Sequence, residues 1–265
     1  MNIRRWTVGV LAAALLVPGM AACNKSESAD PAASASATPA DPKEALRAST
    51  KELGQGNFTF TMTGAGLTGK GLVHKPSNSV QFDLTFDDGS GSTMGMEMIM
   101  IESDSWVKMD LGELADSVPA MAKLKDKYQH IDKTKIKDSD ALAVDLENPD
   151  PAGADALFKS ITDVQETGKG TYAGKLDVSG VTDSGAIDSD VIKSLGDQAK
   201  ALPFTAKLDD QGRLAELTMP IPAAGETKAH EIKVTYADYG KATGAQKPPA
   251  DKVIEASPET YEMFQ

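Results

Sequence analysis

Cys23 is the only cysteine of this 265-residue chain, and it directly follows a stretch that is typical of export signals. Arg4 and Arg5 give the chain a positive start, residues 6–17 are largely apolar, and small residues precede the cysteine. This order predicts a secretory signal peptide over residues 1–22. Cleavage after it would leave Cys23 as the first residue of the mature protein.

The run Met20-Ala21-Ala22-Cys23 resembles the lipobox of bacterial lipoproteins, although Leu is commoner than Met at its first position. A lipobox cysteine receives a diacylglyceryl group on its thiol before cleavage. We therefore expect Cys23 to be acylated and to hold the protein at the extracytoplasmic face of the cell membrane, because two or more acyl chains anchor a protein stably. An uncleaved membrane helix is the other interpretation, but the apolar run is shorter than the roughly 20 residues that span a bilayer.

A glycine-rich segment over residues 64–71, Gly-Ala-Gly-Leu-Thr-Gly-Lys-Gly, satisfies the nucleotide-binding pattern G-x-G-x-x-G and nearly satisfies the P-loop pattern. The P-loop needs Ser or Thr after its lysine, where Gly71 stands. Both loops also need a helix immediately afterwards, whose N-terminus meets the phosphates. Residues 71–76 are instead typical of a strand and a turn. The segment therefore predicts a glycine-rich hairpin and no nucleotide cofactor.

The other polar candidates match no metal or catalytic pattern. The histidines are isolated and lack the i, i+4 spacing of a helical metal site: His74, His130 and His230. The acidic groups do not match a calcium loop: Asp87-Asp88, and Asp183, Asp188 and Asp190. There is no G-x-S-x-G elbow of an esterase. We expect no metal, no cofactor and no enzymatic activity; a hydrolase built from carboxylates that meet only in space is the remaining enzymatic alternative.

Ala, Ser, Pro and Asp dominate residues 24–41, a composition that cannot bury enough apolar surface to fold. We expect a flexible tether of roughly 20–25 Å between Cys23 and the folded part. Without the signal peptide, 25 Lys and Arg of the original 27 remain against 39 Asp and Glu, a net charge of −14. This balance argues against nucleic acid as a partner and against docking on anionic lipid headgroups.

Residues 42–265 show no second linker, so we expect one domain there. Apolar residues alternate with polar ones in several segments, as in half-buried strands: 58–62, 80–86, 94–101, 172–178, 204–208, 215–221 and 232–236. Helical signals are fewer: a capped helix after Asp41-Pro42, a second after Asp150-Pro151 with Ile161 on its apolar face, and a third over residues 187–195. This pattern predicts an α+β fold with an antiparallel sheet that buries one face.

One of these segments carries a stripe of four alternating methionines: Met94, Met96, Met98 and Met100. A buried strand face explains such a stripe. Methionine is also flexible and polarizable, so the stripe suits an adaptable apolar cavity opposite Phe82 and Phe86. Copper binding by the thioethers is disfavoured, because strict alternation is what any strand shows.

The carboxyl-terminal segment, with Ile-Lys-Val-Thr-Tyr-Ala-Asp-Tyr-Gly-Lys at 232–241 and Pro-Pro-Ala-Asp at 248–251, is similar to the ending of a known family. With the lipobox and the tether, residues 42–256 resemble actinobacterial LppX/LprAFG-type lipoproteins. The resemblance implies a strongly curved antiparallel β-sheet, a half barrel with helices packed on its concave face, similar to the LolA/LolB lipoprotein carriers. It also implies that acyl chains of a lipid or glycolipid lie between sheet and helices, and it supplies no site signature.

The leading hypothesis is a membrane-anchored envelope lipoprotein that binds, and as a carrier transfers, an amphiphilic lipid or glycolipid in an apolar cavity. Strand parity places nine residues on the cavity lining: Phe58, Phe60, Val80, Phe82, Phe86, Met94, Met96, Met98 and Met100. The alternative is a closed-core extracytoplasmic module that docks an envelope transport or signalling partner. A core and a cavity share one alternating pattern, so the sequence leaves both open.

Overall fold

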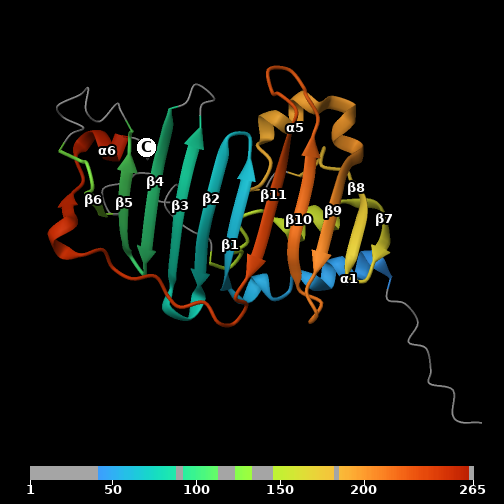
Figure 1. Ribbon diagram of the computed structural model, residues 1–265, viewed down its shortest axis with the longest axis horizontal. Helices are drawn as coiled ribbons and strands as arrows, with labels where there is room; N and C mark the ends of the chain where they lie inside the picture. Colours follow the sequence, from blue (N-terminus) through green and yellow to red (C-terminus); the bar gives the residue numbers. More distant parts are fainter. Residues whose placement is uncertain (1–40, 88–91, 113–122, 133–145, 182–184, 263–265) are drawn as a thin grey trace, which may run out of the picture. The chain divides into compact units, whose positions relative to one another are not determined.

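The computed structural model describes residues 41–87, 92–112, 123–132, 146–181 and 185–262, which belong to one compact unit (Figure 1). Cys23, the predicted signal peptide and residues 24–40 of the tether lie outside the described residues, as do Asp88 and Asp183. Among the described residues, no helix is long and apolar enough to cross a membrane.

The described residues form a 12-stranded sheet in the order β12-β6-β5-β4-β3-β2-β1-β11-β10-β9-β8-β7. The strands are β1 (Asn57–Gly64), β2 (Leu67–His74), β3 (Ser79–Asp87), β4 (Thr93–Ile101), β5 (Asp104–Asp110), β6 (Tyr128–Asp132), β7 (Ile161–Gly168), β8 (Thr171–Leu176), β9 (Leu202–Leu208), β10 (Leu214–Ile221), β11 (His230–Ala237) and β12 (Val253–Glu255). Neighbours pair antiparallel except β12, which runs parallel to β6. The sheet is open, with β12 and β7 at its edges. The predicted α+β class and antiparallel sheet are confirmed.

The glycine-rich segment forms the β1–β2 hairpin, as predicted. Ala65 and Gly66 make its two-residue turn, and both have positive φ, 49° and 81°. Two positive φ angles match the turn geometry that follows the right-handed twist of paired strands. The chain then continues in β2 to His74, so no helix follows the glycines as a phosphate loop would require.

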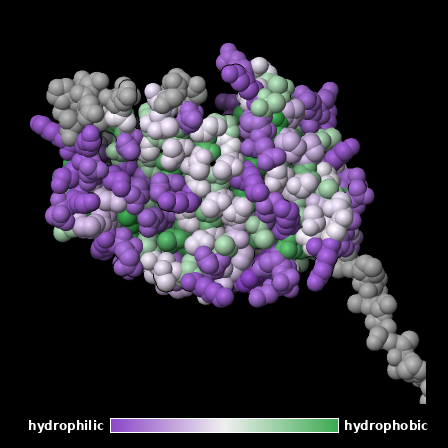
Figure 2. Space-filling view, viewed as in Figure 1, coloured by the Kyte–Doolittle hydropathy of each residue, from purple (hydrophilic) through white to green (hydrophobic). Residues whose placement is uncertain are grey.

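Side-chain alternation gives the sheet two different faces. The inner face carries Phe58 and Phe60 of β1 and, in register, the even-numbered residues of β3 and β4. The outer face carries ion pairs between neighbouring strands, such as Lys70 with Asp83 at 3.0 Å and Lys108 with Glu97 at 2.6 Å. Hydrophilic residues cover much of the surface seen in Figure 2. The inner face carries the larger core, and a smaller buried cluster of Ile99, Trp106, Tyr128 and Ala245 lies on the outer face of β4–β6.

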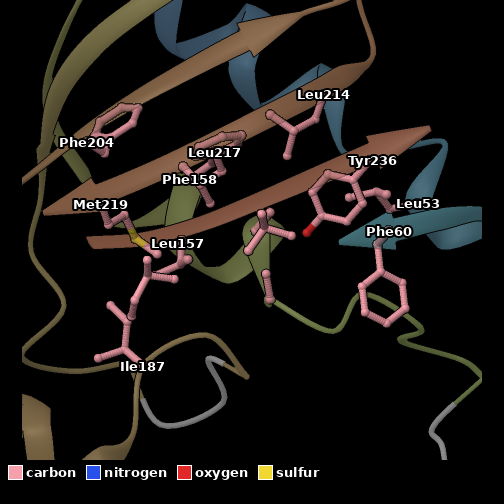
Figure 3. Close-up of a cluster of buried hydrophobic side chains, with 14 of the residues drawn as sticks. Leu53, Phe60, Leu157, Phe158, Ile187, Phe204, Leu214, Leu217, Met219 and Tyr236 are labelled. Carbon is pink, nitrogen blue, oxygen red and sulfur yellow. The ribbon is translucent and has the colours of Figure 1, made fainter. Parts of the chain in front are cut away.

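In the part of the chain that the structure describes, four α-helices accompany the sheet: α1 (Pro42–Ser49), α4 (Ala154–Lys159), α5 (Ser189–Leu195) and α6 (Pro258–Glu262). In Figure 1, α1 and α5 lie at opposite ends of strands β9–β11. Buried residues of α1, α4 and α5 share one cluster with the inner face of β1 and β8–β11: Leu46, Leu157, Phe158, Ile192 and Leu195. Figure 3 shows how Phe158 and Leu157 approach the strand residues Phe204, Leu217 and Met219. The same cluster continues across the inner face of β2–β6, through Val73, Val80, Met98, Val107 and Ile131.

The second helix differs from its prediction. Asp150 does not begin it; the Asp150 carboxylate accepts hydrogen bonds from the backbone N–H groups of Ala152 and Ala154, at 3.0 and 2.5 Å, and α4 starts at Ala154. Ile161, predicted on the helix face, begins β7 and pairs with Leu176. The spacing of an apolar residue just after a helix is compatible with both a helix face and the start of a strand. For Ile161, the pairing with β8 determines that it belongs to a strand.

The same Asp150 ties the loop before α4 to the sheet. The Tyr236 hydroxyl of β11 donates a hydrogen bond of 2.6 Å to the Asp150 carboxylate. Burial raises the pKa of Asp150 above 3.8, against the lowering effect of its three hydrogen bonds. Burial and the nearby Asp150 carboxylate also raise the pKa of the Tyr236 hydroxyl well above 10. This contact links α4, which covers the core, to the central strand β11.

We predict that Asp150→Asn makes stability less dependent on pH. Because the folded-state pKa of Asp150 is raised, the native protein binds its proton more tightly than the unfolded chain. The contribution of Asp150 to the free energy of unfolding therefore falls as pH rises above about 3.8, by at most about 1.4 kcal/mol per pH unit. Urea unfolding between pH 4 and pH 7 should show the wild type losing stability relative to the variant. A relative gain of the wild type with pH would mean that the three hydrogen bonds outweigh burial.

Candidate functional site

An apolar pocket of about 330 Å³ lies on the inner face where β1, β2, β3 and β11 meet the segment that leads into α5. Met62, Leu67, Phe86 and Ile232 line it from the strands. Ile187 and Val191 line it from the opposite side, just before and within α5. We call this space the apolar pocket. Its volume is at the lower end of the range for small-molecule sites.

Sheet register brings the strand residues of the pocket together. Leu67 of β2 pairs with Gly64 of β1 on one side and with Phe86 of β3 on the other. Met62 continues the inner-face alternation of β1 and pairs with Val234 of β11. Since these positions share one face and adjoin in register, their side chains form one apolar wall.

The helix side of the pocket is positioned by the cap of α5. The Asp188 carboxylate accepts a hydrogen bond of 2.7 Å from the backbone N–H of Asp190, which begins the helix directly beside the pocket. Ile187 is buried in the core, and Figure 3 shows it on the same side as Leu157 and Met219. The cap therefore places Ile187 and Val191 over the ends of β1 and β2.

Few polar residues line the pocket. They are Thr63, Asp188, Thr227 and His230, and no Lys or Arg is among the described lining residues. By strand parity His230 belongs to the inner face, and its Nδ1 lies 2.9 Å from the backbone oxygen of Lys228. Among the described lining residues, Asp188 alone carries a formal charge when His is counted as neutral. The pocket is thus apolar with a weakly polar, acidic margin.

A wider and more open depression of about 750 Å³ shares His230 with the apolar pocket. Leu202, Pro203, Pro220 and Ile221 contribute to its lining. It is shallower, and the residues that form it lie around the ends of β9, β10 and β11. We regard the smaller pocket as the candidate site because strands and a helical segment enclose it from opposite sides.

The nine residues predicted to line a cavity all lie on the inner face but in different surroundings. Five are buried in the packed core: Phe58, Phe60, Val80, Met98 and Met100. Phe82 and Met96 are partly buried against that core. Phe86 and Met94, which pair across β3 and β4, are 41% and 42% exposed. Of the nine, Phe86 alone lines the apolar pocket. The inner face therefore changes along β3 and β4 from closed core to exposed apolar surface.

Gly71 of β2 leaves room for two aromatic side chains of the neighbouring strands to pack against each other in the core. Gly71 pairs with Phe60 on one side and Phe82 on the other, and the two rings meet with centroids 5.8 Å apart. A Cβ atom at Gly71 would lie 2.6 Å from the Phe60 ring and 2.6 Å from the Gln81 backbone oxygen. The glycines that suggested a phosphate loop thus provide space for aromatic packing beneath the pocket.

Apart from Phe86, no lining residue of the apolar pocket was predicted as such; the larger apolar ones among them are Met62, Leu67, Ile187, Val191 and Ile232. Met62 and Ile232 continue alternations that were recognised, so parity alone could have included them. Ile187 and Val191 show the i, i+4 spacing of a helix face, but that spacing does not tell which strand the face meets.

Within the described ranges, no group of three or more His, Cys, Asp or Glu side chains could hold a metal ion. Comparison of the sequence with protein-family models and with curated proteins gives no match. The functional argument therefore depends on the geometry and chemistry of the apolar pocket.

We predict that Gly71→Ala lowers the free energy of unfolding by about 1–3 kcal/mol, because the new methyl group overlaps the Phe60 ring and a backbone oxygen. Gly54→Ala is the matched control, since a Cβ atom there has nothing within 4 Å. Urea unfolding followed by circular dichroism measures both. An unchanged or increased stability of the Gly71 variant would refute the proposed role of this glycine.

Proposed function

We propose that this protein is a membrane-anchored envelope lipoprotein that binds a lipid or glycolipid and carries it as cargo. In this proposal the acyl tail occupies the apolar pocket and extends over the exposed inner-face residues Phe86 and Met94. The single observation that supports it best is the pocket itself, an apolar space left between the strands and the α5 segment. Acylated Cys23 would hold the protein at the extracytoplasmic face of the membrane.

The proposal includes a specific arrangement of the sheet and the helices. We infer that the open sheet curves as a half barrel, as in the LppX/LprAFG-type and LolA-like carriers, and that α1, α4 and α5 lie on its concave side. The inner-face cluster that these helices share with β1 and β8–β11 is consistent with that arrangement. In such a fold, a cavity arises where the helices cover the sheet incompletely.

Burial drives binding in this proposal. Each methylene group that leaves water for the pocket contributes roughly 0.8 kcal/mol, part of which offsets the motional freedom lost on association. Uptake and release then require no covalent step, so we propose a binding protein and not an enzyme. The flexible tether would keep the pocket close to the membrane that supplies the lipid.

Native mass spectrometry of the protein purified from its own envelope tests the proposal. We expect a discrete adduct that organic solvent extracts as lipid. A bare mass, together with no uptake of the neutral apolar dye Nile red, would contradict lipid binding and favour the closed-core docking module.

We predict that Phe86→Asp weakens Nile red binding by about tenfold or more, because a carboxylate on the pocket wall opposes an apolar ligand. Thr85→Asp is the matched control: Thr85 neighbours Phe86 on β3 but belongs to the outer face. Both side chains are exposed, so both variants should fold, as circular dichroism would verify. Equal binding by the two variants would exclude Phe86 from the site.

We predict that Cys23→Ser, made behind a signal peptide that is cleaved without acylation, moves the protein from the membrane fraction to the soluble fraction, because it removes the thiol that carries the anchor. Immunoblots of fractionated cells, with mass spectrometry of the mature N-terminal peptide, measure this. Continued membrane association of the variant would point to an anchor other than acylated Cys23.

A further inference from the structure

We infer that the apolar pocket selects an uncharged amphiphile with a single acyl chain, of the monoacylglycerol or one-chain glycolipid class. The inference rests on the proposed function and specifies its cargo. Two independent observations lead to it: the volume of the pocket and the charge of its lining.

The volume limits the number of chains. A water-sized group takes up about 30 Å³ of liquid, and a methylene group is of similar size. A pocket of about 330 Å³ thus holds roughly ten such groups, which is most of one medium-length chain. A second chain would have to lie outside this volume.

The packed core holds two of the walls in place. Ile187 and Ile232 are 3% and 6% exposed and belong to the packed core cluster. A Cβ atom at Gly64 would already lie 3.0 Å from the Ile232 side chain. Since cores pack at nearly crystalline density, widening this pocket would disturb the contacts of both isoleucines.

The charge of the lining disfavours an anionic headgroup, by an amount that water and salt reduce because Asp188 is exposed. The one lining residue that is charged at neutral pH is Asp188, and no lining Lys or Arg is present in the described part of the chain to pair with a carboxylate or phosphate. The N–H of Asp190 at the start of α5 already donates to Asp188. An anion would therefore meet a like charge, with no partner to compensate it.

Hydroxyl groups meet a better environment at the same place. The Asp188 carboxylate accepts hydrogen bonds from hydroxyl donors, while the Thr227 hydroxyl and the His230 ring can donate or accept. A glycerol or sugar headgroup offers such hydroxyls and has no charge to desolvate. The margin of the pocket thus matches a neutral, hydroxyl-bearing headgroup.

Displacement of Nile red tests both parts, using the whole chain with Cys23→Ser so that its own acyl group cannot compete. The competitors share one tail: monolauroylglycerol, laurate and dilauroylglycerol, each below its aggregation concentration at neutral pH. We expect monolauroylglycerol to displace the dye at concentrations about tenfold lower than either of the others.

Two variants connect this selectivity to the pocket. Ala186→Trp, which fills the pocket from its helix side, should abolish monolauroylglycerol binding, whereas Ala48→Trp on the exposed side of α1 should not. Asp188→Asn keeps a residue that caps helices well but removes the charge. It should bring laurate to within about threefold of monolauroylglycerol.

Each outcome has a distinct meaning. Failure of Nile red and of all three amphiphiles to bind would overturn the proposed function. Laurate binding as tightly as monolauroylglycerol, or an unchanged ratio in Asp188→Asn, would overturn the headgroup inference and leave lipid binding intact. Dilauroylglycerol binding as tightly would overturn the single-chain inference alone. A purely structural role of Asp188 would not change the ratio of the two affinities.

Discussion

The apolar inner face of the sheet is the constraint on which the rest of this structure depends. Every second residue of β1, β3, β4, β10 and β11 faces the same side, so the sheet is stable only if that side is covered. Buried residues of α1, α4 and α5 belong to one cluster with inner-face residues of β1 and β8–β11. The hydrogen bond from Tyr236 to Asp150 holds the loop before α4 against β11. The formation of the core and the placement of the helices therefore depend on each other.

The site arises where this coverage ends. Along β3 the inner-face residues change from Val80, 1% exposed, to Phe86, 41% exposed, and β4 shows the same change from Met100 to Met94. The apolar pocket lies at the exposed end, between the β1–β2 hairpin and the start of α5. Core and site are thus two ends of one apolar face.

An open sheet must also protect its polar face and its edges. On the outer face, Glu216 lies between Lys207 and Lys233, at 2.8 and 2.7 Å, which keeps that face hydrophilic. The edge strand β7 contains two irregularities in its register with β8. Such bulges interrupt the regular backbone pattern that another strand would pair with.

The sequence by itself determined the local pattern of this protein. The alternation of Phe58 and Phe60, the stripe from Met94 to Met100 and the glycine turn at 64–67 predicted strands, faces and a hairpin, because these depend on neighbouring residues. Only the tertiary structure decided which inner-face residues are sealed and which remain open. Parity assigns Met98 and Phe86 to the same face, yet Met98 is buried in the core and Phe86 lines the pocket.

The same distinction applies to the pocket as a whole. Its walls come from a hairpin near residue 65 and a helix start near residue 188, which no sequence period connects. Their meeting depends on β11 pairing with β1, a contact between the two ends of the domain. Periodicity reports which side a residue faces, whereas the volume left above that side depends on how distant segments pack. That is why the sequence predicted an apolar face and only the fold revealed a pocket on it.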